Sequence, residues 1–282
     1  MSIAIPTLQE RLNSPDAEVR RLAVIDLPYS DEDDIELLLL PCLHDADANV
    51  RLEAVRALEG FEDQTTVTAL AQMLLDTSAV VQEAAGLVLA ELKESESAPP
   101  LIPLLTHADA TVRSLALKAV RALRVPEAYE PALNQLKDPS PAVRREAVGV
   151  LGYLKRAEAV GELAEVAAHD PDGEVRRIAV GALGYTNEVS VLPSLMRALN
   201  DSVWMVREEA AATIGKLGMA QATDELVKAM QDDYWQVRVK AARALGVMKA
   251  LPALPALVEA MNDTVSNLRK EAAIALGEIG DK

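Results

Sequence analysis

The three histidines and the one cysteine are the residues best suited to metal binding or nucleophilic attack. His44, His107 and His169 are separated by 63 and 62 residues, which is two periods of an internal repeat of about 31 residues. Stacked repeats would hold the three rings roughly 20 Å apart, too far to share a metal ion. Cys42 lies in the apolar stretch 35–43 and is expected to fill the core. We therefore predict no metal site.

Other catalytic patterns are missing from the sequence. It has no glycine-rich phosphate loop, no Cys-x-x-Cys pair and no plausible Ser-His-Asp arrangement. We predict no catalytic residue and no cofactor. A single cysteine also excludes an internal disulfide framework and fits a reducing compartment. Without a secretory signal or an apolar run long enough to span a bilayer, the sequence predicts a cytoplasmic protein that does not enter a membrane.

A repeated Val-Arg pair indicates the structural elements that would position any site. It recurs every 31 residues, with one interval of 32, and Val81-Gln82 and Leu268-Arg269 fill two further slots. The pairs are Val19-Arg20, Val50-Arg51, Val112-Arg113, Val143-Arg144, Val175-Arg176, Val206-Arg207 and Val237-Arg238. A fixed period of this length is typical of stacked repeats, so we expect nine copies of one unit in a single domain over residues 1–282.

Each repeat is predicted to contain two antiparallel helices. Counting the Arg as position zero, Ala stands at +3 in all nine repeats and an aliphatic residue stands at +7. This spacing marks one face of an α-helix, and the uniform Ala indicates close helix packing. Gly follows at +8 in five repeats, where we expect a helix to end. A second amphipathic stretch, such as residues 225–230, precedes the turn before each pair.

The turns carry a repeated Asp six residues before the Arg, replaced by Ser14 and His107 in two repeats. We expect these Asp and Arg residues to form a structural ladder of ion pairs. Four residues before the Arg stands a predicted N-cap, such as Asp47. In the last three repeats that slot holds Val203, Tyr234 and Val265, so Ser202, Asp233 and Thr264 are predicted to cap instead. The 32-residue interval predicts a bulge in the first helix of repeat six.

Charge is concentrated in the N-terminal half. The net charge is −16, and sixteen acidic and three basic residues lie between Asp31 and Ser97, which accounts for −13 of it. This balance argues against nucleic acid as a partner. We expect a solubilising surface, with an acidic docking face for a basic partner as the alternative.

The pattern Asp-x-x-x-x-Val-Arg-x-x-Ala-x-x-Ala-Leu-Gly, seen at residues 232–246, resembles the HEAT repeat. The resemblance is to the short form found in phycobilisome lyase subunits and many bacterial proteins. It implies an all-α, right-handed α-solenoid of about nine 31-residue hairpins, whose second helices line a concave, partner-binding face. The family includes scaffolds, adaptors, bilin-lyase subunits and an iron-dependent hydroxylase. The hydroxylase carries His-Glu motifs, and this sequence has no His-Glu dipeptide.

Aromatic and basic residues gather in the columns that would face a partner in repeats five to eight. Trp204 and Trp235 share position −3, and Tyr153 and Tyr185 share +9, with Gly149 and Gly181 at +5 expected to leave a recess. The predicted partner-binding residues are Trp204, Trp235, Tyr234, Tyr153, Tyr185, Arg145, Arg177, Lys240 and Arg243. Aromatic and Arg side chains concentrate binding energy at interfaces.

Two functions follow. The first is a non-catalytic scaffold that binds a protein or peptide on this partly basic groove. The alternative is a bilin-lyase-like subunit or tetrapyrrole chaperone, in which Arg145 and Arg177 would pair with propionates; an absorbance shift on mixing with biliverdin would distinguish it. The final repeat shows no separate polar cap, so Ile274 and Ile279 are expected to face a partner or a second copy of the chain.

Overall fold

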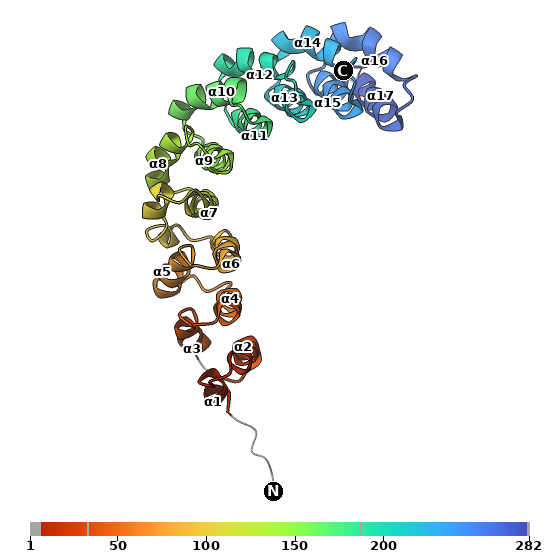
Figure 1. The fold of residues 1–282 in the computed structure, drawn as a ribbon. Coiled ribbons are helices and arrows are strands. Elements are labelled where there is room, and N and C mark those ends of the chain that lie inside the picture. The colour runs from red at the N-terminus through yellow and green to blue at the C-terminus, as the bar shows by residue number, and fades with distance from the viewer. Residues whose placement is uncertain (1–6, 33, 187, 281–282) are drawn as a thin grey trace. The chain divides into compact units, whose positions relative to one another are not determined.

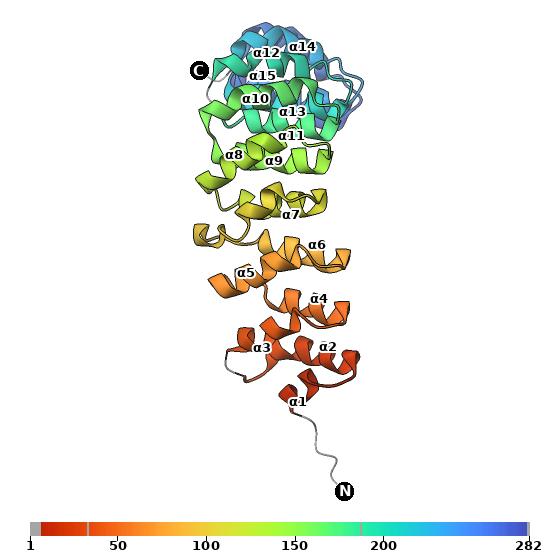
Figure 2. The same cartoon turned by 60° about the vertical axis from the view of Figure 1, so that its left-hand side comes forward.

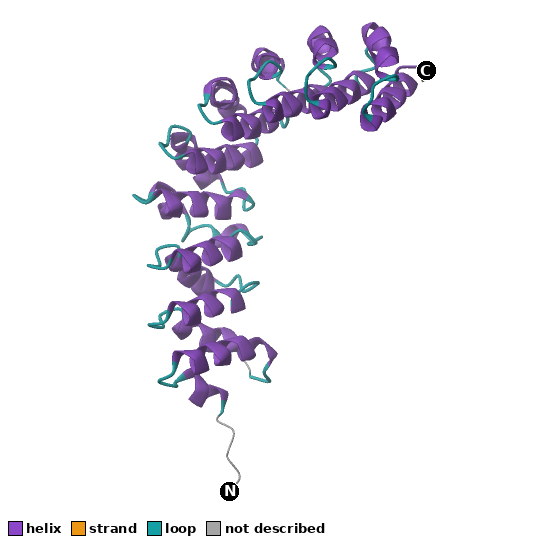
Figure 3. Ribbon diagram, turned by 45° about the vertical axis from the view of Figure 1, so that its right-hand side comes forward, coloured by secondary structure: helices purple, strands orange, loops and turns teal. Residues whose placement is uncertain are grey.

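The computed structural model describes residues 7–32, 34–186 and 188–280, and all regular structure in these residues is helical (Figure 1, Figure 3). The chain divides into two compact units, Met1–Gln135 and Leu136–Lys282. In each repeat the second helix is longer than the first. The all-α prediction is confirmed, whereas the single domain predicted for 1–282 stays a prediction.

The first unit contains the following α-helices (α) and 3₁₀-helices (η): α1 (Leu8–Leu12), α2 (Ala17–Asp26), η1 (Leu27–Tyr29), α3 (Ile35–Cys42), α4 (Ala48–Ala57), α5 (Gln64–Met73), α6 (Ala79–Leu89), η2 (Ser95–Ser97), η3 (Ile102–Thr106), α7 (Ala110–Arg121), η4 (Pro126–Ala128) and α8 (Tyr129–Gln135).

The second unit contains α9 (Pro141–Leu154), η5 (Ala157–Ala159), α10 (Val160–His169), α11 (Gly173–Leu183), η6 (Val189–Val191), α12 (Leu192–Ala198), α13 (Trp204–Leu217), η7 (Ala220–Ala222), α14 (Thr223–Ala229), α15 (Trp235–Val247), η8 (Leu251–Ala253), α16 (Leu254–Ala260) and α17 (Ser266–Gly280).

The second helices of consecutive repeats pack directly on one another. In the first unit α2, α4, α6 and α7 follow in order, and in the second unit α9, α11, α13, α15 and α17 do the same (Figure 1). The Ala at position +3 is fully buried in all nine repeats. This confirms the close packing predicted from the repeated Ala, because a larger side chain at +3 would separate neighbouring helices.

Glycine at position +8 serves the same packing in repeats five, seven and eight, where it lies inside the helix, contrary to the prediction. In repeat six the prediction is confirmed, because Gly184 is the C-cap of α11. Gly152, Gly215 and Gly246 lie inside α9, α13 and α15. A Cβ atom added to Gly215 would lie 2.7 Å from Cβ of Ala244 in the next repeat, and one added to Gly246 would lie 2.7 Å from Cβ of Ala275. The helices approach too closely at these positions for any side chain.

Two first helices differ from expectation. In repeat four the first helix is the 3₁₀-helix η3, in a segment with Pro99, Pro100 and Pro103, whose missing N–H groups disfavour a regular α-helix. In repeat six α10 runs unbroken as an α-helix over ten residues, so the predicted bulge is wrong. The extra residue is absorbed by a first helix longer than the seven-residue α12, α14 and α16.

The predicted ladder is confirmed, and each of its ion pairs joins consecutive repeats. Guanidinium Nε and Nη2 of one repeat donate to both carboxylate oxygens of the Asp in the next repeat, at 2.6–2.9 Å. These pairs are Arg20–Asp45, Arg51–Asp76, Arg144–Asp170, Arg176–Asp201 and Arg207–Asp232. Such bidentate, charge-assisted bonds are among the strongest that side chains form.

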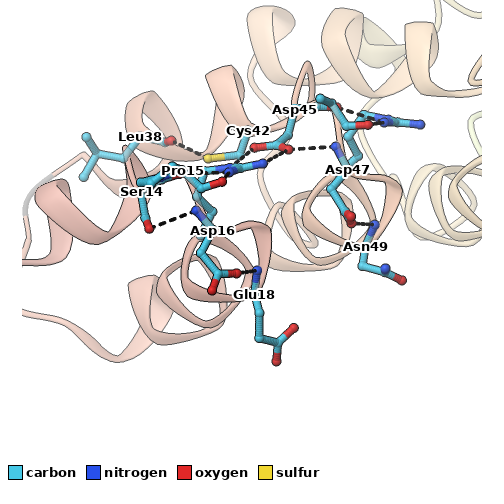
Figure 4. Close-up of polar contacts among 12 residues, drawn as sticks. Ser14, Pro15, Asp16, Glu18, Leu38, Cys42, Asp45, Asp47 and Asn49 are labelled. Atoms are coloured by element: carbon cyan, nitrogen blue, oxygen red, sulfur yellow. Dashed lines mark hydrogen bonds and ion pairs between the residues drawn. The ribbon is translucent and has the colours of Figure 1, made fainter.

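Each pair also fixes two turns. Nη1 of Arg20 donates to the carbonyl oxygens of Ser14 and Pro15 in its own repeat, at 2.8 and 3.2 Å. Oδ1 of Asp45 accepts from the backbone N–H of Asp47 at 2.8 Å, and Asp47 in turn caps α4 by accepting from Asn49 (Figure 4). The hydrogen bonds from Arg20 lower the pKa of the Asp45 carboxyl.

The offset between partners explains why Gln82 and His107 depart from the pattern in consecutive repeats. Because an Arg pairs with the Asp of the following repeat, Gln82 in repeat three needs no carboxylate in repeat four, and His107 stands there. Nδ1 of His107 accepts from the Asp109 N–H at 3.1 Å, which preserves the turn. At Ser14 the hydroxyl accepts from the Asp16 N–H at 3.2 Å, which preserves the first turn in the same way.

The turns of the last repeats keep the backbone of the others. Val203 and Tyr234 are the N-caps of α13 and α15, with φ near −92° and ψ near 118°, close to the values at Asp47. Their N–H groups donate to Asp201 and Asp232. The prediction that Ser202 and Asp233 take over capping is therefore wrong, because the ladder Asp holds the turn and only the cap side chain changes.

Candidate partner-binding surface

All nine predicted partner-binding residues lie in the second unit, on α9, α11, α13 and α15 or directly beside them. Trp204 and Trp235 begin α13 and α15, whereas Tyr153 lies at the end of α9 and Tyr185 follows α11. Positions −3 and +9 are twelve residues apart, which is about 18 Å along a helix. The aromatic residues thus form two groups at opposite ends of the second helices.

The first group centres on a ring stack between Trp204 and Tyr234. Their ring centroids are 5.3 Å apart and their planes differ by 10°. The guanidinium of Arg207, which belongs to the ladder, lies 5.7 Å from the centre of the Tyr234 ring. Trp235 is 39% exposed and Tyr234 is 45% exposed. Both rings therefore present apolar surface to solvent at the start of α15.

The stack follows from the changed residue at position −4. A capping Asp at this position, as in Asp47, turns its side chain back to its own helix. Val203 and Tyr234 have no carboxylate and make no capping bond. They lie instead against position −3 of the preceding repeat. A Cβ added to Gly173 would lie 2.8 Å from Cγ2 of Val203, and Tyr234 stacks on Trp204.

The second group centres on Tyr185, which is 53% exposed and lies between two lysines. Nζ of Lys216 is 3.8 Å from the ring centre, and Nζ of Lys155 is 5.1 Å from it. Tyr185 also lines a pocket of about 320 Å³ together with Leu151 and Val160. Sequence reasoning missed both lysines. Lys216 stands at position +9, in the same column as Tyr185, so the column pattern contained that signal.

The four predicted cations are each paired with a carboxylate of the same unit. Their partners are Glu146 for Arg145, Glu174 and Glu209 for Arg177, Glu208 for Lys240 and Glu271 for Arg243. Hydrogen bonds from Arg177 lower the pKa of the Glu174 carboxyl. The sequence showed the cations at +1, +2 and +5 but not these pairings, so the surface carries less positive charge than its columns indicate.

The recess expected beside Gly181 is filled. A Cβ added to Gly181 would lie 3.0 Å from Oε1 of Glu209, the carboxylate that also contacts Arg177. The predicted recess is therefore wrong at this glycine. The space that glycine leaves receives a long side chain from the next helix.

The cysteine and the histidines, for which the sequence predicts no metal-binding or catalytic role, make local contacts. Sγ of Cys42 is 3.3 Å from the carbonyl oxygen of Leu38, and burial raises the pKa of its thiol. His169 contacts Glu165 and Arg197. Over residues 7–32, 34–186 and 188–280, no three His, Cys, Asp or Glu side chains form a group suited to a metal ion.

A stack of helical hairpins with a buried Ala column and an Arg–Asp ladder is an α-solenoid. The HEAT-repeat family model matches residues 5–90, 69–132, 162–246 and 223–282. The chain belongs to the HEAT-repeat family. A comparison with curated proteins gave no match.

Solved structures share the fold at low sequence identity. An engineered protein aligns with 22% identity and a TM-score of 0.55, covering 96% of this chain and 87% of its own. YibA of Escherichia coli aligns with 18% identity and a TM-score of 0.66, covering 95% and 99%. A structure of Kap95p with RanGDP aligns with 15% identity and a TM-score of 0.71, covering 96% and 45%.

None of the helices in the described residues has the length and apolar character needed to cross a bilayer.

Proposed function

We propose that the protein is a non-catalytic scaffold that binds a protein or peptide along the second helices of repeats five to eight. The observation that carries the proposal is the exposure of Tyr234 and Trp235 beside Trp204 at the starts of neighbouring helices. Aromatic residues make up only 3% of the chain, yet Tyr234 stacks on Trp204 and is followed in the sequence by Trp235. Half-exposed aromatic rings on rigid helices lose little entropy on binding and are typical binding hot spots.

The paired cations shape the kind of partner that this surface would accept. Arg177 is held by Glu174 and Glu209, so a bound carboxylate would have to compete with two existing partners. Aromatic contact, with Lys155 and Lys216 beside Tyr185, is therefore expected to contribute more than charge. No observation favours the bilin-lyase-like alternative, because the two arginines proposed to hold propionates, Arg145 and Arg177, are already paired.

Replacing both Trp235 and Tyr185 with alanine is expected to reduce capture of the partner at least tenfold, since a central aromatic residue often contributes about 2 kcal/mol or more to binding. Pull-down from lysate with quantitative mass spectrometry measures the effect. Tyr29→Ala is the matched control, because Tyr29 occupies the same column as Tyr185 in the first unit and is 88% exposed. Equal capture by the double variant and the wild type would contradict the proposal.

Self-association through the C-terminal repeat is a second proposal, supported by exposed apolar side chains on the last hairpin. Leu254, Val258 and Met261 are 36%, 56% and 40% exposed and fall on one face of α16 and its end, and Ile274 on α17 is 43% exposed. Sedimentation velocity is expected to show a dimer for the wild type and a monomer for Val258→Glu, since a buried carboxylate opposes association. A wild-type protein that stays monomeric at every concentration rules this out.

A further inference from the structure

An open groove lies between the second helices of repeats two and three, in the acidic first unit. It has a volume of about 380 Å³ and runs between the end of α4 and the length of α6. These two helices are neighbours in the stack (Figure 2). Its lining residues are Arg56, Glu59, Val80, Glu83, Ala84, Leu87, Val88 and Glu91. None of these is among the residues of the proposed partner-binding surface, which belongs to the other unit.

The floor of the groove is apolar and accessible. Val80 and Leu87 are 57% and 52% exposed, and Ala84 lies between them in the sequence. The spacing of Val80, Ala84, Leu87 and Glu91 is that of one face of a helix. From Val80 to Glu91 this face extends about 17 Å, which matches three turns of a partner helix.

The rim of the groove is acidic and its carboxylates are not neutralised within the described part of the chain. Glu59, Glu83 and Glu91 form no ion pair there, and the one cation of the groove, Arg56, lies 3.3 Å from Glu53. The other unit is different, because its predicted cations and the carboxylates beside them pair with one another. The groove thus combines an exposed apolar floor, formed by Val80 and Leu87, with a rim of carboxylates that form no ion pair among the described residues.

From these observations we infer that the groove binds a basic amphipathic helix of a partner protein. Apolar side chains of such a helix, spaced three and four residues apart, would cover Val80 and Leu87, and its flanking Lys or Arg would pair with Glu59, Glu83 and Glu91. A nucleic acid or a second copy of this chain, whose net charge is −16, would be repelled by the same carboxylates. The acidic half is then a docking surface and not only a solubilising one.

The test uses the full chain and two synthetic peptides about three turns long. One contains Leu at helical spacing with Lys elsewhere, and the other has Glu in place of every Lys. Fluorescence anisotropy of the labelled peptides measures Kd. The Leu-Lys peptide is expected to bind and the Leu-Glu peptide to fail. Equal binding of the two peptides would overturn the inference.

Variants locate the bound peptide. Glu83→Gln with Glu91→Gln is expected to weaken binding about 3- to 10-fold, and Leu87→Ser about tenfold or more. These side chains are exposed and Gln favours helix, so the helical circular dichroism signal is expected to persist. Glu158→Gln with Glu162→Gln is the matched control, because it removes the same charge from exposed positions in the other unit.

Three results would overturn the inference. An equal loss of peptide affinity in the Glu158→Gln, Glu162→Gln control would mean that the peptide is attracted by the net charge of the protein and not by the groove. Unchanged binding by Leu87→Ser would mean that the groove is empty. A dimer of the wild type in sedimentation velocity that Leu87→Ser abolishes would make a second copy the occupant. None of these results bears on capture by Trp235 and Tyr185, so the two proposals fail independently.

Discussion

Replacing Asp170 with alanine is expected to lower the free energy of unfolding by about 3 kcal/mol. Asp170 accepts both donors of Arg144 and also the N–H of Asp172, and the Arg144 and Asp170 side chains are only 10% and 4% exposed. Without the carboxylate, a nearly buried guanidinium keeps its desolvation cost and loses its partner. Urea unfolding followed by circular dichroism measures the change in midpoint.

Asp224→Ala is the matched control for this prediction. Asp224 is exposed on the first turn of α14, and the expected loss there is within about 0.5 kcal/mol. The converse experiment supplies the missing ion pair between repeats three and four through Gln82→Arg with His107→Asp. A double-mutant cycle is expected to give a favourable coupling of about 1 kcal/mol. A loss at Asp170 no larger than that at Asp224 would show that the ladder adds little to stability.

Replacing Gly215 with alanine is expected to destabilise the protein by about 2 kcal/mol, although alanine is the better helix former. The new Cβ would lie 2.7 Å from Cβ and 2.8 Å from Cα of Ala244, so α13 and α15 would have to separate. Part of the clash is with backbone, which no rotamer change can relieve. Thermal unfolding by circular dichroism gives the sign directly.

Gly161→Ala provides the opposite case. Gly161 lies within α10, and a Cβ added there meets no atom within 4 Å. The same substitution is expected to stabilise the protein by about 0.5–1 kcal/mol, because alanine restricts the unfolded chain and favours helix. If both variants shift the melting temperature upward, close approach at Gly215 does not limit side-chain size.

The repeat period predicted the fold because the residues that recur in it make the same packing contacts from repeat to repeat. The Ala column showed how closely helices pack, and the Asp and Arg columns predicted the ladder. The direction of each ion pair was not evident from a single repeat. It was nevertheless encoded in the sequence, since Gln82 and His107 depart from the pattern in consecutive repeats. Comparing exceptions between neighbouring repeats would have revealed it.

The candidate site was less predictable, because the contacts of its side chains depend on neighbouring residues that differ from repeat to repeat. The column pattern placed Trp204 beside Trp235, whereas the ring that stacks on Trp204 is Tyr234. The cations were evident in the sequence, but their pairing with Glu174, Glu209 and Glu271 depended on rotamers and on the offset between helices. The net charge of this surface therefore could not be predicted without the three-dimensional structure.

The offset pairing gives the stack of repeats a fixed order. Because the Arg of each bidentate pair binds an Asp of the following repeat, the part of this protein that could be exchanged without breaking a pair is the junction between two repeats, and not the 31-residue repeat itself. Excising repeat three, for instance, would place the guanidinium of Arg51 opposite the imidazole of His107 where it now meets Asp76. To shorten, lengthen or shuffle the array without losing an ion pair, the chain must be cut so that each Arg stays with the Asp of the following repeat.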